Sequence, residues 1–391
     1  MRVAIIADDL TGAADTGVQL ARAGYRTAVA FRGAPIPPGD DLDAVALDTD
    51  SRAMPAGFAA KRVVEAGHAV RHARIVYKKL DSTLRGPIAA ELSAALSASG
   101  RDRAVVAPAF PAAGRTTVEG VQLVRGVPVH ETEAKDDPRT PVREGHVPTL
   151  LAAAFPSVVS LSTEDLAHPA TVRRALEEAR CIVADAARDE DLEALVRAVP
   201  DPSEVLWAGS AGLAVALGRV YPGPHTGTTP SARARRVLVV VGSLSKVARG
   251  QLRSLKEHGC AAVPVSGAGG EALWKAREAL SGGSCAALHS AEGRISSGAG
   301  DVAGMLAEVV GVLSEENLFD ALVLTGGDTA VRVAQRLGAT GVLLQGEIEP
   351  GVPVGTLIGP KPYRVVTKAG GFGDAGTLLK AVQILLKDGK D

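Results

Sequence analysis

The stretch YKKLDSTLRG at residues 77–86 concentrates side chains that can do chemistry: two lysines, an aspartate, two hydroxyls and an arginine. The apolar run before it is typical of a short strand, and the apolar spacing after Pro87 is typical of a helix that begins with proline. The polar side chains are therefore expected on a strand-to-helix loop. In a parallel sheet such loops line the carboxyl edge of the strands, where ligands bind.

Three other predicted strands in the first half of the chain also end in polar loops. They lie at residues 2–7, 43–47 and 103–107. Because parallel strands bring their carboxyl ends to one edge, four loops are expected to converge on one crevice. The charged residues that would meet there are Asp8, Asp9, Asp48, Arg52, Lys79, Asp81, Arg85 and Arg115.

A set of this kind fits a small anion that carries several hydroxyl groups. Arg85 and Arg115 could hold a carboxylate in bidentate fashion. Asp8, Asp9 and Asp81 could accept hydrogen bonds from hydroxyls. Each residue alone is more simply explained as a helix cap or a surface ion pair. Together they predict a binding site for a hydroxy acid.

Three loops in the second half of the chain are rich in glycine or small polar residues and lie between a strand and a helix, at residues 242–245, 326–329 and 370–373. Backbone N–H groups at a helix N-terminus attract phosphate, and glycine lets the phosphate approach. Three such loops predict a nucleotide-binding domain, although the P-loop motif GxxxxGK[ST] does not occur. The candidate nucleotide-binding residues are Ser243, Ser245, Gly326, Gly327, Asp328, Thr329, Gly370, Gly371 and Gly373.

The alternation of strands and helices predicts an α/β protein, and 391 residues exceed what one core usually supports. We expect two domains, each with a mainly parallel sheet flanked by helices, and an active site in the interdomain cleft. Residues 221–235, rich in Pro, Gly, Thr and Ser, are the predicted linker between a substrate domain at 1–220 and a nucleotide domain at 236–391. Residues 119–148 break the alternation, which indicates a hairpin and a loop acting as a lid or interface arm.

The composition limits the classes of partner. With 43 basic and 44 acidic residues the net charge is −1, which gives no electrostatic reason to expect nucleic acid or an anionic membrane. No apolar run approaches a membrane span and no signal peptide is evident, so a cytoplasmic protein is expected. Cys181, Cys260 and Cys285 lie far apart in apolar runs and are predicted to be buried free thiols, with no metal site.

Seven segments of the chain resemble the four-carbon acid sugar kinase family, in order and across both halves. They are IADDLTGAADTG at 6–17, KKLDSTLRG at 78–86, APAFPAAGRTT at 107–117, GSAGLA at 209–214, TGGDTA at 325–330, PGVPVG at 350–355 and TKAGGFG at 367–373. The resemblance implies ATP-dependent phosphorylation of the terminal (4-) hydroxyl of threonate, erythronate or a 3-oxo-tetronate. It also implies that the first domain binds the sugar acid and the second binds ATP, with Mg²⁺ on the phosphates.

By the same resemblance, the residues that face the substrate are Asp8, Asp9, Lys79, Asp81, Ser82, Arg85 and Arg115. Asp9 is the first candidate for the base that takes the hydroxyl proton, and Asp374, in a Gly-Phe-Gly-Asp turn, is the second. Lys79 would supply positive charge for the transferring group. The partners expected are a small sugar acid and, for assembly, either no other chain or a second copy in a homodimer.

Two other functions stay open. Lys79, crowded by Lys78, could form a Schiff base in a lyase or aldolase that acts on a keto acid. A non-catalytic sensor could instead couple a sugar-acid domain to a nucleotide domain. Borohydride trapping would identify the first, and thermal stabilisation by ligands without ADP release would identify the second.

Overall fold

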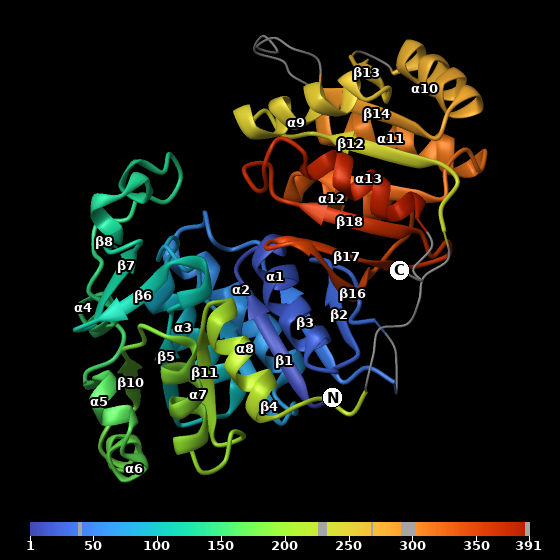
Figure 1. Cartoon of the computed structure of the whole chain (residues 1–391). Coiled ribbons are helices and arrows are strands. Elements are labelled where there is room, and N and C mark those ends of the chain that lie inside the picture. The colour runs from blue at the N-terminus through green and yellow to red at the C-terminus, as the bar shows by residue number, and fades with distance from the viewer. Residues whose placement is uncertain (38–40, 226–232, 267–268, 291–301, 388–391) are drawn as a thin grey trace. The chain divides into compact units, whose positions relative to one another are not determined.

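The computed structural model describes residues 1–37, 41–225, 233–266, 269–290 and 302–387. Contacts divide the chain into two compact units, drawn mainly in blue to green and in yellow to red in Figure 1. Unit 1 comprises Met1–Arg32 and Gly39–Thr226, and unit 2 comprises Gly33–Pro38 and Gly227–Asp391. Residues 226–232 of the predicted linker lie outside the described residues.

The strands of unit 1 pair in parallel, as the sequence predicts. In spatial order they are β2 (Thr27–Ala30), β3 (Ala44–Asp48), β1 (Val3–Ala7), β4 (Ile75–Lys79), β11 (Val205–Gly209), β5 (Arg103–Ala107), β10 (Cys181–Ala184) and β9 (Val158–Leu161). Most of their residues are buried, as expected of a parallel sheet covered on both faces. The short strand β2 is an addition to the predicted set.

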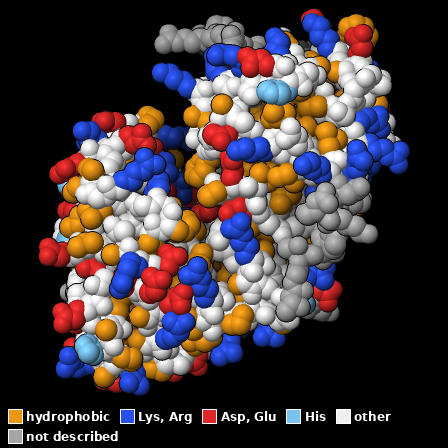
Figure 2. Space-filling model, in the orientation of Figure 1, with side chains coloured by type: hydrophobic (Ala, Val, Ile, Leu, Met, Phe, Trp, Pro, Cys, Tyr) orange, Lys and Arg blue, Asp and Glu red, His pale blue; other side chains and the backbone are white. Residues whose placement is uncertain are grey.

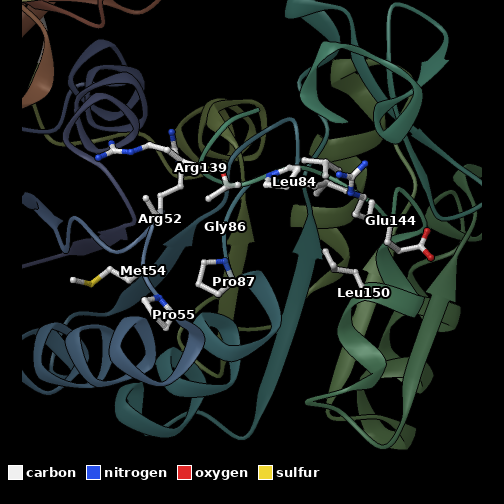
Figure 3. A pocket seen from close by; sticks show the side chains of 14 residues that line it. Arg52, Met54, Pro55, Leu84, Gly86, Pro87, Arg139, Glu144 and Leu150 are labelled. Atoms are coloured by element: carbon white, nitrogen blue, oxygen red, sulfur yellow. The ribbon is translucent and has the colours of Figure 1, made fainter. Parts of the chain in front are cut away.

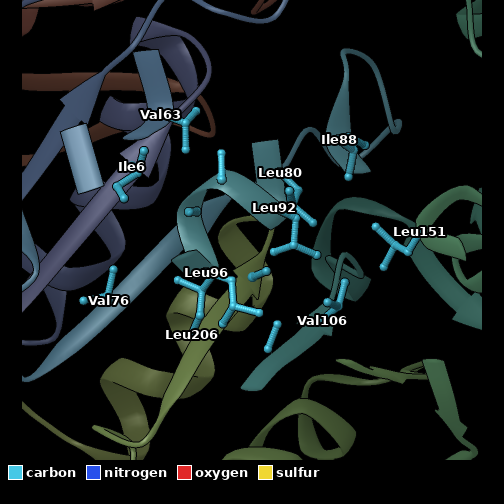
Figure 4. Packing of buried hydrophobic residues seen from close by; sticks show 14 of the residues in the cluster. Ile6, Val63, Val76, Leu80, Ile88, Leu92, Leu96, Val106, Leu151 and Leu206 are labelled. Carbon is cyan, nitrogen blue, oxygen red and sulfur yellow. The ribbon is translucent and has the colours of Figure 1, made fainter. Parts of the chain in front are cut away.

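Helices flank the strands of unit 1: α1 (Leu10–Arg22), α2 (Ala56–Val70), α3 (Ile88–Ser99), α4 (Val147–Ala152), α5 (Thr163–Leu166), α6 (Pro169–Glu178), α7 (Asp189–Ala198) and α8 (Ala211–Val220). Helices α2 and α3 pack on each other, and Val63 and Leu92 join Ile6 and Val76 in one buried cluster (Figure 4). Helix α1 packs on α8. This packing fixes the loops at the carboxyl ends of the strands.

The predicted hairpin at residues 119–148 is present. Strands β7 (Val121–Val124) and β8 (Val127–Pro128) pair in antiparallel fashion around Gly126, which has a φ of 80°. The structure adds β6 (Arg115–Val118), which pairs with β7, so the three strands form a separate small sheet. Short 3₁₀ helices at Pro111–Ala113, Val129–Glu131 and Glu133–Asp136 lie on either side of this sheet in the chain.

Unit 2 has a mixed sheet. Its strands, in spatial order, are β13 (Ala261–Val265), β14 (Cys285–Ser290), β12 (Val237–Val241), β15 (Ala321–Thr325), β18 (Arg364–Lys368), β17 (Val352–Ile358) and β16 (Gly341–Glu349). The first five are parallel, whereas β17 runs antiparallel to both neighbours. The helices are α9 (Lys246–Glu257), α10 (Gly270–Gly282), α11 (Val302–Glu315), α12 (Gly327–Arg336) and α13 (Thr377–Leu386).

The prediction of three free thiols is wrong for two of the cysteines. Cys260 and Cys285 form a disulfide with a Cα–Cα distance of 5.1 Å. They are 25 residues apart in the chain, but the parallel register pairs Ala261 with Ala286 and so places the preceding cysteines opposite each other. Cys181 is a buried free thiol as predicted, and burial raises its pKa to about 12.

Figure 2 shows basic and acidic side chains interspersed over the visible face. Within the part of the chain that the structure describes, no helix combines the length and the apolar character needed to cross a membrane.

Candidate functional site

Three of the four charged loops in unit 1 follow neighbouring strands. Strand β1 lies between β3 and β4, and its register pairs Ala7 with Asp48 and Ile6 with Lys78. The residues that follow each strand therefore meet at one edge of the sheet. The outcome is a compact cluster of charged side chains, which we call the charged edge: Asp8, Asp9, Arg52, Lys79, Asp81 and Arg85.

Arg52 is the centre of the charged edge, because its guanidinium binds two carboxylates at once. Its Nε lies 2.6 Å from Oδ2 of Asp8, and its Nη1 lies 2.6 Å from Oδ2 of Asp9. Its Nη2 also donates to both, at 3.0 Å to Asp8 and 2.8 Å to Asp9. Sequence analysis placed Arg52 at this edge but gave it no role. Its position just after a strand was the only signal.

The two aspartates have different environments. The side chain of Asp8 is 4% exposed, whereas that of Asp9 is 29% exposed and accepts a hydrogen bond of 2.7 Å from the backbone N–H of Gly12 at the start of α1. Burial acts to raise both pKa values. For Asp8 the charges of Arg52 and Lys78 outweigh burial and lower the pKa. For Asp9 burial, aided by repulsion from Asp8, outweighs Arg52 and raises the pKa.

Asp81 is a second carboxylate that already has its own cation. It accepts hydrogen bonds from Nε of Arg85 at 2.7 Å and from Nη2 at 3.2 Å, and from Thr83 at 2.5 Å. Burial acts to raise the pKa of Asp81, but the nearby Arg52 and Arg85 hold it well below its usual range. Arg85 also lies 3.5 Å from Asp137.

Arg115, the predicted companion of Arg85, donates to the backbone carbonyl of Ala113. Its Nε is buried, with no hydrogen-bond partner among the described residues. The carbonyl of Ser82 accepts a bond of 2.9 Å from Gln122 on β7, so the small sheet holds the loop that contains the predicted substrate residues.

Lys79 is 4% exposed, and its Nζ donates to the carbonyl of Leu80 at 2.8 Å. A Cβ atom at Gly12 would lie 3.2 Å from this Nζ and 2.7 Å from Oδ1 of Asp9. The ammonium group and the carboxylate therefore flank the same turn of α1.

Lys78 points to different partners. Its Nζ lies 2.9 Å from Glu91 on α3, and both side chains are almost fully buried. Ser51 donates to the other oxygen of Glu91 at 2.6 Å. Because Glu91 neutralises Lys78, crowding by Lys78 is a weaker reason to expect Schiff-base chemistry at Lys79. Glu91 lies in the helix after the predicted loop, and no local sequence pattern marked it.

Two further aspartates near the charged edge have raised pKa values. Burial raises the pKa of Asp48 to about 7, against the effect of a hydrogen bond from the backbone of Asp50. Burial likewise raises the pKa of Asp15 on α1, which interacts electrostatically with Lys79 and Asp9. Asp15 was not among the predicted site residues.

A cavity of about 480 Å³ lies beside Arg52 in unit 1. Arg52 and Arg139 lie at one end of it, and Glu144 and Leu150 lie at the other (Figure 3). Its volume is within the usual range for small-molecule sites. Its lining comes from the loops after β3 and β4 and from the segment at residues 139–144.

The three glycine-rich or small polar loops of unit 2 follow the adjacent strands β12, β15 and β18. Ser245 caps α9 by accepting from the backbone of Ala248 at 3.1 Å, and it donates to the carbonyl of Gly370 at 2.6 Å. Ser243 lies against the same glycine, since a Cβ at Gly370 would come within 1.9 Å of its hydroxyl. The first and third loops are therefore in direct contact.

The second loop joins them through main-chain contacts. Gly326, with a φ of 102°, donates its N–H to the carbonyl of Lys368 at 2.9 Å. A Cβ at Gly242 would collide with the hydroxyl of Thr329 at 1.9 Å. By contrast, a Cβ at Gly327 or at Gly371 would meet no atom of the described residues within 4 Å. The backbone is thus open to a ligand at the start of α12, at Gly327, and in the loop before α13, at Gly371.

Asp374, the second candidate base, lies at the start of α13. It accepts from the backbone of Gly376 at 2.8 Å and pairs with Lys380 at 3.0 Å. These contacts, first of all that with Lys380, lower its pKa. Asp374 is thus a paired carboxylate in the turn before α13, and its lowered pKa contrasts with the raised pKa of Asp9.

For a nucleotide-bound Mg²⁺ the structure offers few protein ligands. No group of three or more His, Cys, Asp or Glu side chains is arranged around a metal position in the portion that the structure describes. Asp328, an exposed carboxylate in the first turn of α12, is the acidic residue of the second loop. This fits Mg²⁺, which is usually bound through one or two carboxylates together with substrate phosphates and water.

Comparisons with known proteins agree with this geometry. The family described as "Sugar-binding N-terminal domain" matches residues 3–217, and the family described as "Nucleotide-binding C-terminal domain" matches residues 238–378. A D-threonate kinase of Bordetella bronchiseptica is 39% identical over 405 aligned residues, covering 98% of this chain and 97% of that protein. A D-erythronate kinase of Heliobacterium modesticaldum is 33% identical over 444 residues, covering 98% and 97%.

One solved structure adds a statement on assembly. It is a domain of unknown function from Bordetella bronchiseptica, described as a domain-swapped dimer with bound citrate. It is 36% identical to this chain, covers 99% of both chains, and has a TM-score of 0.52.

Proposed function

Because the chain belongs to the four-carbon acid sugar kinase family, we propose that it transfers the terminal phosphoryl group of ATP to the 4-hydroxyl of a four-carbon sugar acid. D-Threonate is the first candidate, since the D-threonate kinase is the more similar of the two relatives described above. The observation that carries the proposal is the order of the two family matches. The sugar-binding match covers the charged edge, and the nucleotide-binding match covers the three loops of unit 2.

Asp9 is the proposed general base. Its carboxylate is partly exposed, and burial raises its pKa, so it can take a proton more readily than Asp8 or Asp81. In the reaction the substrate oxygen bonds to the γ-phosphorus of ATP, the bond to the leaving ADP oxygen breaks, and the hydroxyl proton passes to Asp9. Arg52 holds the carboxylate in place through two hydrogen bonds.

The remaining charged residues would position the substrate and the phosphoryl group. Lys79 lies beside the same turn as Asp9 and supplies positive charge near the reacting hydroxyl. Asp8, Asp81, Ser82, Arg85 and Arg115 are the proposed substrate-binding residues. Apart from Arg52, no residue of the charged edge is in the lining of the cavity described above, so we place the acid at the charged edge itself.

In unit 2 the proposed nucleotide site consists of the three loops. Ser243, Ser245, Thr329 and the glycines at 326, 327, 370, 371 and 373 would surround the phosphates, with Asp328 next to Mg²⁺. When bound, Mg²⁺ would neutralise charge on the phosphates. Asp374 is retained as the second candidate base, although its pairing with Lys380 and its contact with the backbone of Gly376 support a structural role instead.

The organisation of the protein completes the proposal. We place the sugar-acid domain at residues 1–220, the linker at 221–235 and the nucleotide domain at 236–391, close to the division into compact units at residue 226. Supply of ATP favours a cytoplasmic enzyme, where the Cys260–Cys285 pair would meet reducing thiols. A homodimer is supported by the dimer described for the relative of known structure.

The test is ADP release measured over D-threonate, D-erythronate and the 3-oxo-tetronates, with and without Mg²⁺. We expect release that depends on both Mg²⁺ and one of these acids. Citrate and glycerate serve as acids of the wrong length. Thermal stabilisation by the acids and by ATP without any ADP release would favour the sensor, and an imine trapped by borohydride on Lys79 would favour the lyase.

A further inference from the structure

Lys368, the last residue of β18, carries a buried ammonium group that its surroundings leave without an acceptor. The residue is 4% exposed, and its Nζ has no hydrogen-bond partner among the described residues. Thr325, the last residue of β15, is its register partner and is completely buried. The hydroxyl of Thr325 likewise lacks a partner in that set. Two adjacent buried donors without acceptors are costly, so the site is incomplete as it stands.

The position of Lys368 in the sheet shows which face it occupies. Side chains two residues apart on a strand share a face, so Lys368 lies on the same face as Val366. Val366 packs in one cluster with Leu378 and Val382 of α13. Lys368 therefore lies under the start of α13, beneath the loop at residues 370–373.

The charged groups around this position do not satisfy the lysine. Glu349 interacts with it electrostatically, but no salt bridge within 4 Å joins the two among the described residues. The carboxylate of Glu349 accepts instead from Thr377 and lies 3.4 Å from Lys380. Lys380 is also paired with Asp374, and Asp328 is exposed on the neighbouring α12. Burial lowers the pKa of Lys368 to about 8, against the opposing effect of Glu349.

We propose that Lys368 binds the phosphates of the nucleotide, with the Thr325 hydroxyl as a second donor. The proposal rests on the proposed function, because it names the group in unit 2 that meets the negative charge of ATP. Phosphate oxygens provide the acceptors that both donors lack, at an edge where the N-termini of α12 and α13 already favour an anion. Lysine carries its charge on a flexible four-carbon stem, so the ammonium can turn toward an anion bound at this edge.

The contacts that hold the loop at residues 370–373 leave room for a phosphate. Its carbonyls accept from Ser245 at Gly370 and from Gln251 at Phe372 and Asp374, with distances of 2.6, 3.0 and 2.7 Å. These are contacts from side chains of α9 and its cap, and a Cβ at Gly371 would meet no atom of the described chain within 4 Å. The backbone beside Lys368 is therefore accessible to a phosphate at Gly371.

The experiment compares Lys368→Met, Lys368→Arg and a control, Lys361→Met, in the full-length protein. Lys361 lies just before the opposite end of β18 and binds the carbonyl of Ser314 and the side chain of Asn317. Calorimetry would measure the affinities for ATP, ADP and adenosine. We expect Lys368→Met to weaken ATP and ADP by about 10- to 100-fold while adenosine changes little, as the loss of a charged hydrogen bond predicts. The control should leave the ATP-to-adenosine ratio unchanged.

A pH series and a melting curve separate a phosphate contact from a structural role. Wild-type affinity for ATP should fall as the pH rises through about 8, where free Lys368 loses its proton. Lys368→Arg should lack this step, because arginine stays charged. Without ligand, Lys368→Met should melt no lower than wild type, since it removes a buried unpaired charge.

Three outcomes overturn the proposal. An unchanged ATP-to-adenosine ratio in Lys368→Met, with wild type binding ATP normally, refutes this inference and leaves the kinase function standing. Wild type that fails to bind ATP or ADP at all refutes the nucleotide site and this inference with it. If Lys368→Met does not fold, the absence of the pH step in Lys368→Arg decides the question, and its presence refutes the inference.

Discussion

The two sheet edges that carry the candidate site residues differ in how their charges are compensated. At the charged edge of unit 1, Asp8 and Asp9 share Arg52, and Asp81 has Arg85. At the edge of unit 2, Lys368 and Thr325 have donors but no acceptors among the described residues. Carboxylates are thus paired with arginines at the first edge, whereas two buried donors at the second have no acceptor among the described residues. We expect such a difference if, as proposed, the first edge binds the hydroxyl groups of a sugar acid and the second binds phosphate.

The largest effect should follow removal of the proposed base. Asp9→Asn keeps the shape of the side chain and can still cap α1, but it cannot accept the hydroxyl proton. We expect kcat to fall about 10²- to 10⁴-fold while ATP affinity changes little. Steady-state kinetics with calorimetric ATP binding would measure both. A variant with normal turnover would assign the base to another residue of the charged edge.

The second effect concerns the stability that the ion pairs of Arg52 give to unit 1. Arg52→Met should lower the free energy of unfolding by about 3–5 kcal/mol, because it leaves the buried carboxylate of Asp8 and the partly exposed one of Asp9 without their shared cation. Urea denaturation at pH 7.5 would measure the loss. Arg62→Met, which removes contacts with the Thr49 and Asp50 carbonyls on the nearby surface, is the matched control and should cost much less. Equal losses would mean that the Arg52 cluster contributes no more than a surface contact.

The third effect depends on pH and involves Asp48. Its pKa of about 7 in the folded protein lies above the ordinary value near 4, so folding favours the protonated form. The cost of ionisation therefore appears as the pH rises above 4 and is complete above 7. Asp48→Asn should be more stable than wild type at pH 8 and equal to it near pH 4, as followed by thermal melting.

Asp8→Asn should change the melting temperature at pH 8 in the opposite direction. The pKa of Asp8 is lowered, so its ionised form stabilises the fold above about pH 4 and the variant should melt lower than wild type at pH 8. If the melting temperatures of Asp48→Asn and Asp8→Asn both rise or both fall at pH 8, the opposite pKa shifts assigned to these two aspartates are wrong.

The smallest effect is expected at Asp374. Asparagine can accept the same hydrogen bond from the backbone of Gly376, so Asp374→Asn should leave kcat within about twofold of wild type. The same kinetic assay as for Asp9→Asn measures this. A loss of kcat as large as that of Asp9→Asn would identify Asp374 as the base and place the base in unit 2 instead of unit 1.

Most strands could be predicted from the sequence because their signal is local. Apolar runs at residues 2–7, 43–47 and 103–107 marked β1, β3 and β5 to within a residue at each end. The strand β2 has only four residues, TAVA, which is too short for a clear strand pattern in the sequence. The β16–β17 hairpin was also missed, since its Pro350-Gly351 turn resembles any other loop until the strands pair.

The sequence predicted where the site residues lie, but only some of the contacts between them. The spacing of charges after strands brought Asp8, Asp9 and Lys79 to one edge, because parallel strands end together. Which cation would bind which carboxylate depends on side-chain reach. Arg52 was therefore predicted at this edge without its partners, and Glu91 was missed. The Cys260–Cys285 disulfide was missed for a similar reason, since it follows from the register of β13 and β14.

The most direct test of the account is the identity of the product. D-Threonate, ATP and Mg²⁺ would be incubated with the protein, and the mixture followed by phosphorus NMR and mass spectrometry. We predict one equivalent of ADP for each equivalent of threonate phosphorylated at its terminal oxygen, and no product with Asp9→Asn. ATP hydrolysed to ADP and inorganic phosphate with no phosphorylated acid, for any four-carbon acid in the panel, would contradict the account.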